Sequence, residues 1–381
     1  MRYYLWHRFI YMVLRIAVCP FVRSAMGYSC HKTKGPERPS LIISNHNTDL
    51  DPALVGMCFS RHVYYLASEH AFRNGFPSKV LKAVFAPIPI DKTRADISAI
   101  KEMIRRIKAG ANVCLFAEGD RSFTGTTSPI ALSTAKLVRT CGVDLITFRL
   151  EGGYFTQPRW SRSQRRGKMA GFVIGRYSAA EIASMTDRQI LNAIEKDIYE
   201  DAYERQKVNF IRFKGKNLAE SIETTLFLCP GCGKFGTIRS EGDRFSCACG
   251  VNGTYTETGF LAGDSPFSTI AEWGEWQSGK LEEIVRDAGG ESICEDDEQQ
   301  LFEVKPTIEK TLLGTGKLRI DREALHCAGF TFPLKQITQV EVVGQMTLLF
   351  AVKGNTTYEV RSATPRSALK YREIFHNLRS F

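Results

Sequence analysis

A histidine and an aspartate are separated by four residues in the stretch NHNTDLDP (45–52). An imidazole such as that of His46 accepts a proton near neutral pH. A carboxylate bonded to its other ring nitrogen, here that of Asp51, would fix the tautomer and stabilise the imidazolium. The pair would then act as a general base on an acceptor hydroxyl, a role that contributes on the order of 10²–10⁴ to a rate. The alternative is that His46 is a hydrogen-bonded core histidine and the spacing is accidental.

A second polar stretch, LFAEGDRSFTG (115–125), also follows an apolar run. The planar guanidinium of Arg121 offers five donors in a geometry that suits phosphate. Glu118 and Gly119 lie at the same expected strand end, where a carboxylate could hold a glycerol hydroxyl. The acidic Asp120 would oppose a bound phosphate unless it points away or pairs with a cation. The alternative for this stretch is a tight turn with a surface salt bridge.

Two further stretches supply cations. PIPIDKTRAD (87–96) places Lys92 and Arg94 after another apolar run. RWSRSQRRGK (159–168) is densely basic and would bind a headgroup phosphate or the phosphates of coenzyme A. A solvated loop is the alternative for residues 159–168.

Short apolar runs alternate with helical patterns between residues 40 and 176, and these elements must position the polar stretches. The runs fit strands buried on both faces of a sheet: LIIS (41–44), HVYYLA (62–67), FAPIPI (85–90), NVCLF (112–116), DLITF (144–148) and GFVIG (171–175). Helices are predicted over 97–110 and 131–142, where Gly110 and Gly142 suit helix C-caps, and one polar helix over 186–206. The alternation predicts an α/β domain with a mostly parallel sheet flanked by helices.

The expected topology brings the polar stretches together, because open α/β sheets bind ligands at the carboxyl ends of their strands. His46 follows the strand 41–44 directly. Pro52 suits the first turn of a helix, which makes Asp51 the expected N-cap of that helix.

The N-terminal residues 3–22 are predicted to form a helix with an apolar face. The residues close to that face are Trp6, Phe9, Ile10, Val13, Ala17 and Phe21. Arg8 and Arg15 share another face, so residues 1–28 are interpreted as a membrane-interface helix. The alternative is a helix packed on its own domain. The longest uncharged stretches are too short to span a bilayer, so the chain is expected to lie on a membrane or in the cytosol.

In these motifs the sequence resembles the glycerolipid acyltransferases, specifically the 1-acylglycerol-3-phosphate acyltransferases. NHNTDLDP matches the family's N-H-x4-D block, and FAEGDRS resembles its F-P-E-G-T-R-S block, with Ala117 for proline and Asp120 for threonine. IPIDKTRAD resembles a block that usually reads V-D-R, with Lys92 in the place of arginine. DLITFRLEGG lacks the proline of the fourth block. The blocks keep the family's order and spacing over about residues 1–205.

The resemblance implies that His46 is the general base, Asp51 its orienting partner, and Glu118, Gly119 and Arg121 the acceptor-binding set. It implies direct transfer of an acyl chain from a thioester, either acyl-CoA or acyl-carrier protein, without an acyl-enzyme. The acceptor would be a lysophospholipid such as 1-acyl-glycerol-3-phosphate, and the product phosphatidic acid for phospholipid biosynthesis. The departures from the family blocks concern the identity of the acceptor more than the type of reaction.

Four cysteines lie in two close pairs within LCPGCGKFGTIRSEGDRFSCACG (228–250): Cys229, Cys232, Cys247 and Cys249. Two such turns separated by a short hairpin supply four thiolates for one tetrahedral, structural zinc ion. Residues 225–260 are therefore predicted to be a zinc-ribbon-like module, with a redox pair as the alternative.

The rest of the chain divides by pattern. Residues 29–212 form the expected acyltransferase domain, 261–300 a connector with a helix over 265–290 and the acidic run ICEDDEQQ (293–300), and 301–381 seven short strands and a closing helix. This order of elements resembles a pleckstrin-homology or GRAM-type fold. Such a domain would bind lipids or proteins, or would merely dock on the catalytic domain.

The charge is unevenly distributed along the 381 residues. Residues 1–220 hold 34 Lys and Arg against 19 Asp and Glu, a net +15, whereas residues 221–381 hold 17 against 22, a net −5. A zinc ribbon that grips nucleic acid should be basic, so this distribution argues against the rival class of nucleic-acid-binding protein. The other rival is a non-catalytic lipid-binding scaffold, which the two motif sets disfavour. Eleven cysteines with C-x-x-C spacing suit a reducing compartment, so we expect the cytoplasmic face of a membrane.

Overall fold

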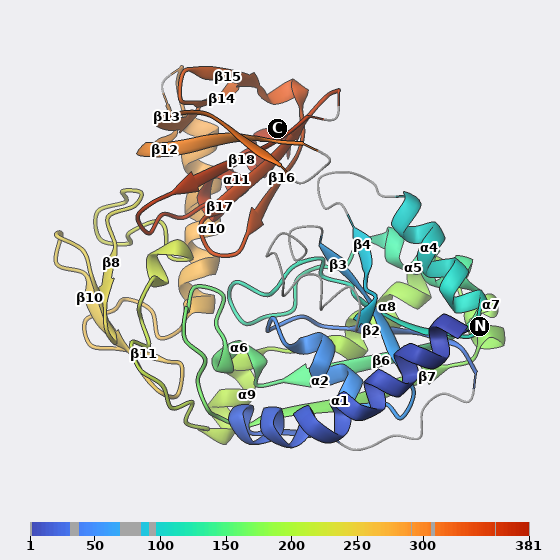
Figure 1. Cartoon of the computed structure of the whole chain (residues 1–381). Coiled ribbons are helices and arrows are strands. Elements are labelled where there is room, and N and C mark those ends of the chain that lie inside the picture. The colour runs from blue at the N-terminus through green and yellow to red at the C-terminus, as the bar shows by residue number, and fades with distance from the viewer. Residues whose placement is uncertain are drawn as a thin grey trace. The chain divides into compact units, whose positions relative to one another are not determined.

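The computed structural model describes residues 2–30, 38–68, 85–90, 97–290, 292–305, 309–354 and 356–380 (Figure 1). Two compact units are distinguished by their contacts. The described residues before 160, together with Ser163–Gly215, form the first unit, and Trp160–Arg162 with Lys216–Phe381 form the second. Lys92 and Arg94 lie outside the described residues.

The first unit is built on a seven-stranded sheet in the order β1-β7-β6-β2-β5-β3-β4. Its strands are β1 (Tyr28–Cys30), β2 (Ser40–Ser44), β3 (Val63–Ser68), β4 (Ile88–Ile90), β5 (Asn112–Phe116), β6 (Asp144–Glu151) and β7 (Met169–Tyr177). All neighbours pair in parallel except β6 and β7, which are antiparallel. The predicted mostly parallel sheet is thereby confirmed.

Helices cover both faces of this sheet. They are α1 (Arg2–Met26), α2 (Asp51–Cys58), α4 (Ile97–Lys108), α5 (Leu132–Cys141), α6 (Gly153–Thr156), α7 (Ala179–Ser184), α8 (Asp187–Ile198) and α9 (Ala202–Asn209). The central strand β2 is fully buried, as its apolar run predicts. Its Leu41 and Ile43 pack in a core with α4, α5 and α8, whereas Ile42 packs in a second core with α1 and α2. The sheet is therefore the middle layer of three.

The predicted helix over 186–206 is wrong as a single element. The chain leaves the helical conformation at Tyr199 (ψ 127°), and Asp201 caps a new helix, α9, by accepting bonds from the backbone N–H groups of Tyr203 and Glu204. Ile190, Leu191, Ile194 and Ile198 keep a helical period up to the break, so the pattern gave no sign of it. Glu200 lies in the break and is 4% exposed.

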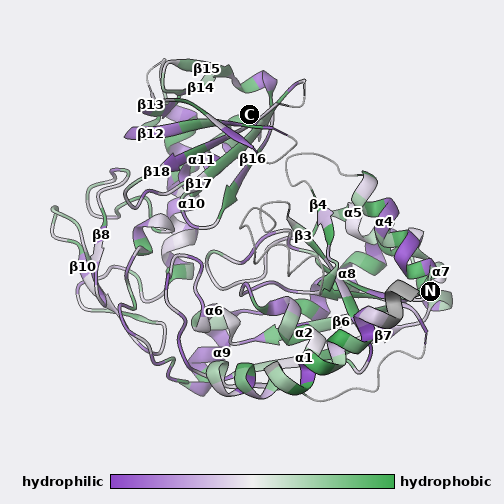
Figure 2. Ribbon diagram, viewed as in Figure 1, coloured by the Kyte–Doolittle hydropathy of each residue, from purple (hydrophilic) through white to green (hydrophobic). Residues whose placement is uncertain are grey.

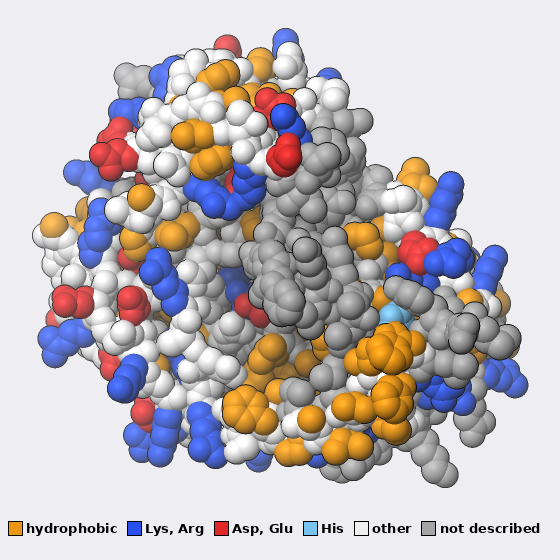
Figure 3. Space-filling view, in the orientation of Figure 1, with side chains coloured by type: hydrophobic (Ala, Val, Ile, Leu, Met, Phe, Trp, Pro, Cys, Tyr) orange, Lys and Arg blue, Asp and Glu red, His pale blue; other side chains and the backbone are white. Residues whose placement is uncertain are grey.

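The N-terminal helix α1 turns its polar side inward. Arg15 Nη1 donates to the carbonyl of Phe59 at 2.6 Å, Tyr11 donates to the carbonyls of Gly56 and Phe59, and His7 Nδ1 lies 3.0 Å from Tyr64 Oη. The large apolar side chains of its other side are exposed: Trp6, Phe9, Met12, Val13, Ile16 and Phe21. Figure 3 shows hydrophobic side chains gathered over α1, and Figure 2 shows hydrophobic segments recurring along it.

In the described part of the chain, no single helix is long and apolar enough to cross a membrane. One bent pair within α1, Trp6–Ala17 and Cys19–Met26, passes the length and composition test with a bend of 47°.

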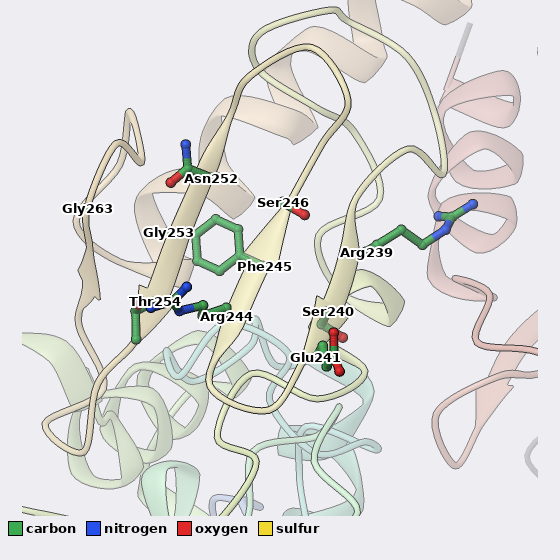
Figure 4. A pocket seen from close by; sticks show the side chains of 10 residues that line it. All are labelled: Arg239, Ser240, Glu241, Arg244, Phe245, Ser246, Asn252, Gly253, Thr254 and Gly263. Carbon is green, nitrogen blue, oxygen red and sulfur yellow. The ribbon is translucent and has the colours of Figure 1, made fainter.

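The second unit starts with a small antiparallel sheet in the order β11-β10-β9-β8. Its strands are β8 (Arg239–Glu241), β9 (Arg244–Ser246), β10 (Asn252–Tyr255) and β11 (Leu261–Ala262), preceded by the short 3₁₀ helix η2 (Ile222–Thr224). A hollow over this sheet is lined by polar side chains including Arg239 and Arg244 (Figure 4). The predicted helix over 265–290 is confirmed as α10 (Ile270–Asp287).

The rest of the second unit is a mainly β region, as predicted: a seven-stranded antiparallel sheet closed by a helix. It comprises β12 (Cys294–Val304), β13 (Lys310–Ile320), β14 (Ala324–Cys327), β15 (Phe330–Pro333), the 3₁₀ helix η3 (Leu334–Gln336), β16 (Ile337–Val343), β17 (Thr347–Val352), β18 (Thr356–Ser362) and α11 (Leu369–Ser380). The individual strands differ from the prediction, because the two short strands expected within residues 308–320 are one strand, β13, and β12 begins before residue 301. The acidic run 293–300 is expected to be a connector, but its residues 294–300 are instead the first seven of the eleven residues of β12. Its acidic residues mask the strand pattern, because four of them, residues 295–298, follow one another between the buried Cys294 and Gln299, where the strand pairing is irregular.

Candidate active site

His46 and Asp51 form the pair that their spacing predicts. His46 Nδ1 lies 2.8 Å from Asp51 Oδ2, and the aspartate is fully buried whereas the histidine side chain is 21% exposed. Three more hydrogen bonds fix the carboxylate: Asp51 accepts from the backbone N–H of Asn47 at 2.6 Å, the backbone N–H of Thr48 at 2.9 Å and the Thr48 hydroxyl at 2.6 Å. A carboxylate held in this way remains an acceptor for Nδ1–H, so the basic nitrogen of the ring is Nε2.

The predicted N-cap role of Asp51 is wrong. Leu50 is the N-cap of α2 and makes no side-chain capping bond, while Asp51 is the first helical residue. Its carboxylate turns back to the loop 46–48 instead of capping its own helix. The carboxylate of Asp51 therefore bonds to the loop and to His46 instead of to the first turn of α2. This explains why one residue looked both like an N-cap and like the partner of His46.

The ring of His46 stacks on Phe116, the last residue of β5, with centroids 4.4 Å apart and planes inclined by 21°. This contact covers one face of the ring, and Nε2 is the ring nitrogen that is not bonded to Asp51. An acceptor hydroxyl could therefore approach Nε2 without disturbing the bond between Nδ1 and Asp51.

Glu118 joins the two motif loops. One of its carboxylate oxygens accepts from the backbone N–H of His46 and the other from that of Ser128, both at 2.7 Å. Burial raises the pKa of Glu118 to about 8, although these two N–H groups act to lower it. Both oxygens are thus occupied by backbone donors, so the expected bond from Glu118 to a glycerol hydroxyl would have to compete with them. The neighbouring Gly119 has φ +71°, a left-handed conformation that favours glycine.

Arg121 reaches the loop that carries His46. Its Nη1 lies 3.5 Å from Asp49 Oδ2, and its side chain is 11% exposed. The backbone N–H of Ser122 donates to the carbonyl of His46 at 3.1 Å, so the two loops also meet through their main chains. The structure thereby brings Arg121 to the same strand ends as the His46–Asp51 pair.

The unexpected acidic Asp120 is paired with a cation. Asp120 Oδ1 lies 2.5 Å from Nη1 of Arg159, which is 3% exposed and stacks on the ring of Phe123 at 3.8 Å. Arg159 also donates to the carbonyl of Arg121 at 2.9 Å. The solvated-loop alternative for 159–168 is therefore wrong for Arg159 and for the fully buried Arg165, whereas Arg162, Arg166 and Lys168 are exposed.

Sequence reasoning missed the polar residues that support the His46 loop. Asn45, Asn47 and Thr48 are all buried, and the carboxylate of Glu200 accepts bonds from Asn45 and Asn47. The two asparagines flank His46 in the motif, which is a usable signal. No local signal identifies Glu200.

The four predicted cysteine ligands lie together in the second unit. Their sulfur atoms are all within 4.8 Å of one another, with 3.5 Å between Cys229 and Cys249 and 3.9 Å between Cys232 and Cys247. Four thiolates at about 2.3 Å from a zinc ion in a tetrahedron would be separated by roughly 3.8 Å. The spacing of the four sulfur atoms fits a structural zinc ion. A group of four thiols is better explained by metal binding than by one redox pair, which needs only two.

The comparisons with known proteins place a family model on the part of the chain that holds these motifs. The model described as Acyltransferase matches residues 28–151. The lysophosphatidic acid acyltransferase PlsC from Thermotoga maritima is similar in structure, with 16% identity, a TM-score of 0.43, and coverage of 53% of this chain and 80% of that one. The N-terminal PH domain of human ARAP2 is similar with 15% identity, a TM-score of 0.19, and coverage of 24% and 84%. No curated protein matches the chain at a significant level.

Residues 28–151 contain His46, Asp51, Glu118, Gly119 and Arg121. The chain thus carries an acyltransferase domain, as the motifs predict. Glu200 and the second unit lie outside the matched residues.

Proposed function

Because the chain carries an acyltransferase domain, we propose that it transfers a fatty acyl chain from acyl-CoA or acyl-carrier protein to the free hydroxyl of 1-acyl-glycerol-3-phosphate or a related lysophospholipid. The product would be phosphatidic acid or its analogue. The observation that carries the proposal is the bond between His46 Nδ1 and the fully buried Asp51, which leaves Nε2 as the nitrogen that can act as the base.

The reaction needs one proton acceptor and no covalent acyl-enzyme intermediate. His46 Nε2 removes the proton of the acceptor hydroxyl as its oxygen attacks the thioester carbonyl. Asp51 stabilises the imidazolium that forms. When the tetrahedral intermediate collapses, the C–S bond breaks and the imidazolium returns its proton to the departing thiolate. The result is an ester and a free thiol, so atoms and charge balance.

The acceptor phosphate would be held by Arg121. Its present partner, Asp49, is at 3.5 Å and is exposed, so a phosphate dianion could displace it. Arg159 pairs with Asp120, so the charge of that carboxylate is compensated and opposes a bound phosphate less. Lys92 or Arg94 would complete the phosphate site, as the family resemblance implies.

A membrane-surface location through α1 is part of the proposal. It is supported by exposure of the apolar side of α1, where Trp6, Phe9 and Phe21 are each more than half exposed, while the polar side is bonded to the domain. An apolar helix face of this kind is stable against lipid and costly in water. None of the 11 cysteines, all of which lie in the described part of the chain, forms a disulfide bond.

One structural zinc ion held by Cys229, Cys232, Cys247 and Cys249 is also proposed. The support is the near-tetrahedral spacing of the four sulfur atoms. The ion would hold two turns of the chain together, and no residue of the acyl-transfer site is assigned to it.

An assay of the purified protein with acyl-CoA and a panel of lysolipid acceptors, read by lipid mass spectrometry, tests the proposed reaction. We expect acceptor-dependent release of free CoA and a new diacyl product. His46→Ala should lower kcat by about 10²–10⁴, whereas His376→Ala, at an exposed position of α11, should not. Turnover by H46A close to that of the unaltered protein would refute the assignment.

A further inference from the structure

Three arginines line a cavity between α1 and the loop that follows α2. The described residues around it are Arg8, Phe9, Tyr11, Met12 and Arg15 of α1 with Ser60, Arg61 and His62. None of these lining residues is acidic. A cavity with three guanidinium groups and no carboxylate among its described lining residues attracts an anion, and planar guanidinium groups favour phosphate.

Two residues that line this cavity, Arg15 and His62, are held in place by contacts within the first unit. Arg15 is tied to the carbonyl of Phe59 at 2.6 Å, which holds its guanidinium beside the loop. His62 is 6% exposed, and its Nδ1 has no hydrogen-bond partner among the described residues. Burial, with the nearby His7 and Arg106, lowers the pKa of His62 to about 3, so the ring is neutral and can donate one N–H. The cavity wall therefore includes a neutral, buried histidine besides the three arginines.

The rim of the same cavity is apolar and exposed. Phe9 is 56% exposed and Met12 53% exposed, and both belong to the apolar face of α1 that Figure 3 shows. A ligand that matches both parts has a phosphate and a hydrocarbon chain. From this combination we propose that the cavity binds the phosphate headgroup of an anionic phospholipid while its chains lie along α1.

This site extends the proposed membrane attachment and is separate from acyl transfer, because none of its residues belongs to the His46 or Arg121 loops. Binding of the full-length protein to phosphatidylcholine vesicles with and without phosphatidic acid tests it. Arg8→Ala/Arg61→Ala should weaken binding to the anionic vesicles by roughly thirtyfold, since each basic residue near an anionic surface contributes about fivefold. Arg15 is left intact because it also bonds to Phe59.

The control is Arg176→Ala/Arg188→Ala, which removes the same charge from exposed positions of β7 and α8. Equal losses in the two double variants would mean that only net charge matters and would overturn the site. Full displacement from vesicles by inorganic phosphate at concentrations near those of the lipid would also overturn it, because the ligand would then be a free phosphate. H46A should bind vesicles normally, so a failure of catalysis and a failure of this site remain distinguishable.

A second inference comes from the break between α8 and α9. Glu200 Oε2 accepts from Asn47 Nδ2 at 2.7 Å and from Asn45 Nδ2 at 3.4 Å. Its Oε1 accepts from the backbone N–H of Gly152 at 3.0 Å and from Arg205 Nη2 at 2.7 Å. One buried carboxylate thus holds three separate segments of the first unit.

The bond to Asn47 connects Glu200 with the catalytic pair. The backbone N–H of Asn47 donates to Asp51 Oδ2, the same oxygen that faces His46 Nδ1. The side chains on either side of His46 thus both donate to Glu200. The geometry assigns Glu200 the role of a positioning residue that sets Asp51, and through it the tautomer of His46. This inference depends on the proposed acyl transfer.

A polarity swap tests the bond directly. Glu200→Gln alone places an amide N–H₂ against that of Asn47, and Asn47→Asp alone places two carboxylates together, so each should lower kcat by at least about tenfold with little change in KM. In the double variant the donor and acceptor are exchanged and the bond is restored, so kcat should recover to within a few-fold. Glu204→Gln, an exposed change on α9, is the matched control.

The thermal stability of each variant is measured alongside its activity. If kcat followed stability and the double variant were no better than the single variants, the positioning role would be wrong. If the unaltered protein transferred no acyl group, the proposed function would fail instead. The two failures are therefore separate.

Discussion

At the scale of single residues, the site depends on carboxylates whose surroundings differ. Asp51 is held by four hydrogen bonds and faces His46, Glu118 is held by two backbone N–H groups, and Asp120 is paired with Arg159. Only Asp51 contacts the imidazole. The other two carboxylates fix the loop and neutralise a buried cation, so the chemistry rests on one pair and the geometry on its neighbours.

Arg121→Ala should raise the KM for the lysolipid acceptor by about tenfold or more while leaving the KM for acyl-CoA nearly unchanged, because a charged hydrogen bond to phosphate contributes about 1.5–3 kcal/mol. Steady-state kinetics with each substrate varied in turn measure both constants. Arg188→Ala on the exposed side of α8 is the control. An effect confined to the acyl donor would contradict the role of Arg121.

Glu118 predicts a pH dependence of stability. Its pKa is raised to about 8 in the folded protein, above an ordinary value of 4.5, so the folded state binds the proton more tightly than the unfolded state. The stability from this group is fully present below pH ~4.5 and is lost as the pH rises towards 8. The unfolding free energy of the unaltered protein should therefore fall with pH, relative to Glu118→Gln, by a few kcal/mol at most. Denaturant unfolding of both proteins at pH 5 and pH 9 checks this difference.

At the scale of elements, α1 differs from an ordinary surface helix because its polar side faces the domain. Tyr11 and Arg15 bond to carbonyls at the C-terminal end of α2, where a positive charge is favourable. The apolar side of α1 remains exposed and is available for contact with lipid. One side of α1 packs on the domain and the other side is exposed and apolar. Both interpretations of the sequence, packing on the domain and membrane contact, are therefore compatible with the structure.

Replacing Trp6, Phe9 and Phe21 by serine should weaken vesicle binding by about a thousandfold or more, since each side chain would lose roughly 1.5–3 kcal/mol of burial in lipid. Cosedimentation with vesicles measures the change. Leu312→Ser/Phe330→Ser removes exposed apolar side chains from the second unit and is the matched control. If the α1 variant still bound like the unaltered protein, the helix would not be the membrane contact.

At the scale of the whole molecule, the segment around the cysteine turns connects the other parts of the second unit to one another. Trp273 Nε1 on α10 donates to the carbonyl of Leu228, next to Cys229, at 3.0 Å. The Ser367 hydroxyl, just before α11, donates to the carbonyl of Thr224 at 2.8 Å. The four-cysteine turns, α10 and the closing helix are therefore parts of one packed body.

Cys229→Ser/Cys232→Ser should abolish zinc binding and lower the melting temperature of the second unit as a whole. Structural zinc contributes on the order of 10 kcal/mol to small modules, and the bonds of α10 would spread that loss. Native mass spectrometry counts the metal and calorimetry follows the unfolding. Cys19→Ser/Cys141→Ser should retain one zinc ion. A metal-free chain with unaltered unfolding would contradict the site.

Much of the fold follows from the sequence because its signals are local. The fully apolar β2 and the left-handed Gly142 that ends α5 (φ 60°) are where their patterns predict. Glu200 escaped prediction because its function lies in contacts with residues more than 150 positions away, while its neighbours keep a helical period. Residues 294–300 escaped because exposed carboxylates on a strand look like a solvated connector. The inward polar side of α1 depends on carbonyls of α2, which no sequence pattern marks.

The bonds from α1 to α2 have a consequence for any shortened form of the chain. A protein that began at Gly27 would be more soluble, because the exposed apolar side chains of α1 would be gone. It would also lose Tyr11 and Arg15, and the carbonyls of Gly56 and Phe59 would face water at the end of the helix that starts with Asp51. Removal of α1 would thus loosen the helix that carries the proposed catalytic carboxylate. Low activity of such a shortened protein would therefore say little about the activity of the intact chain.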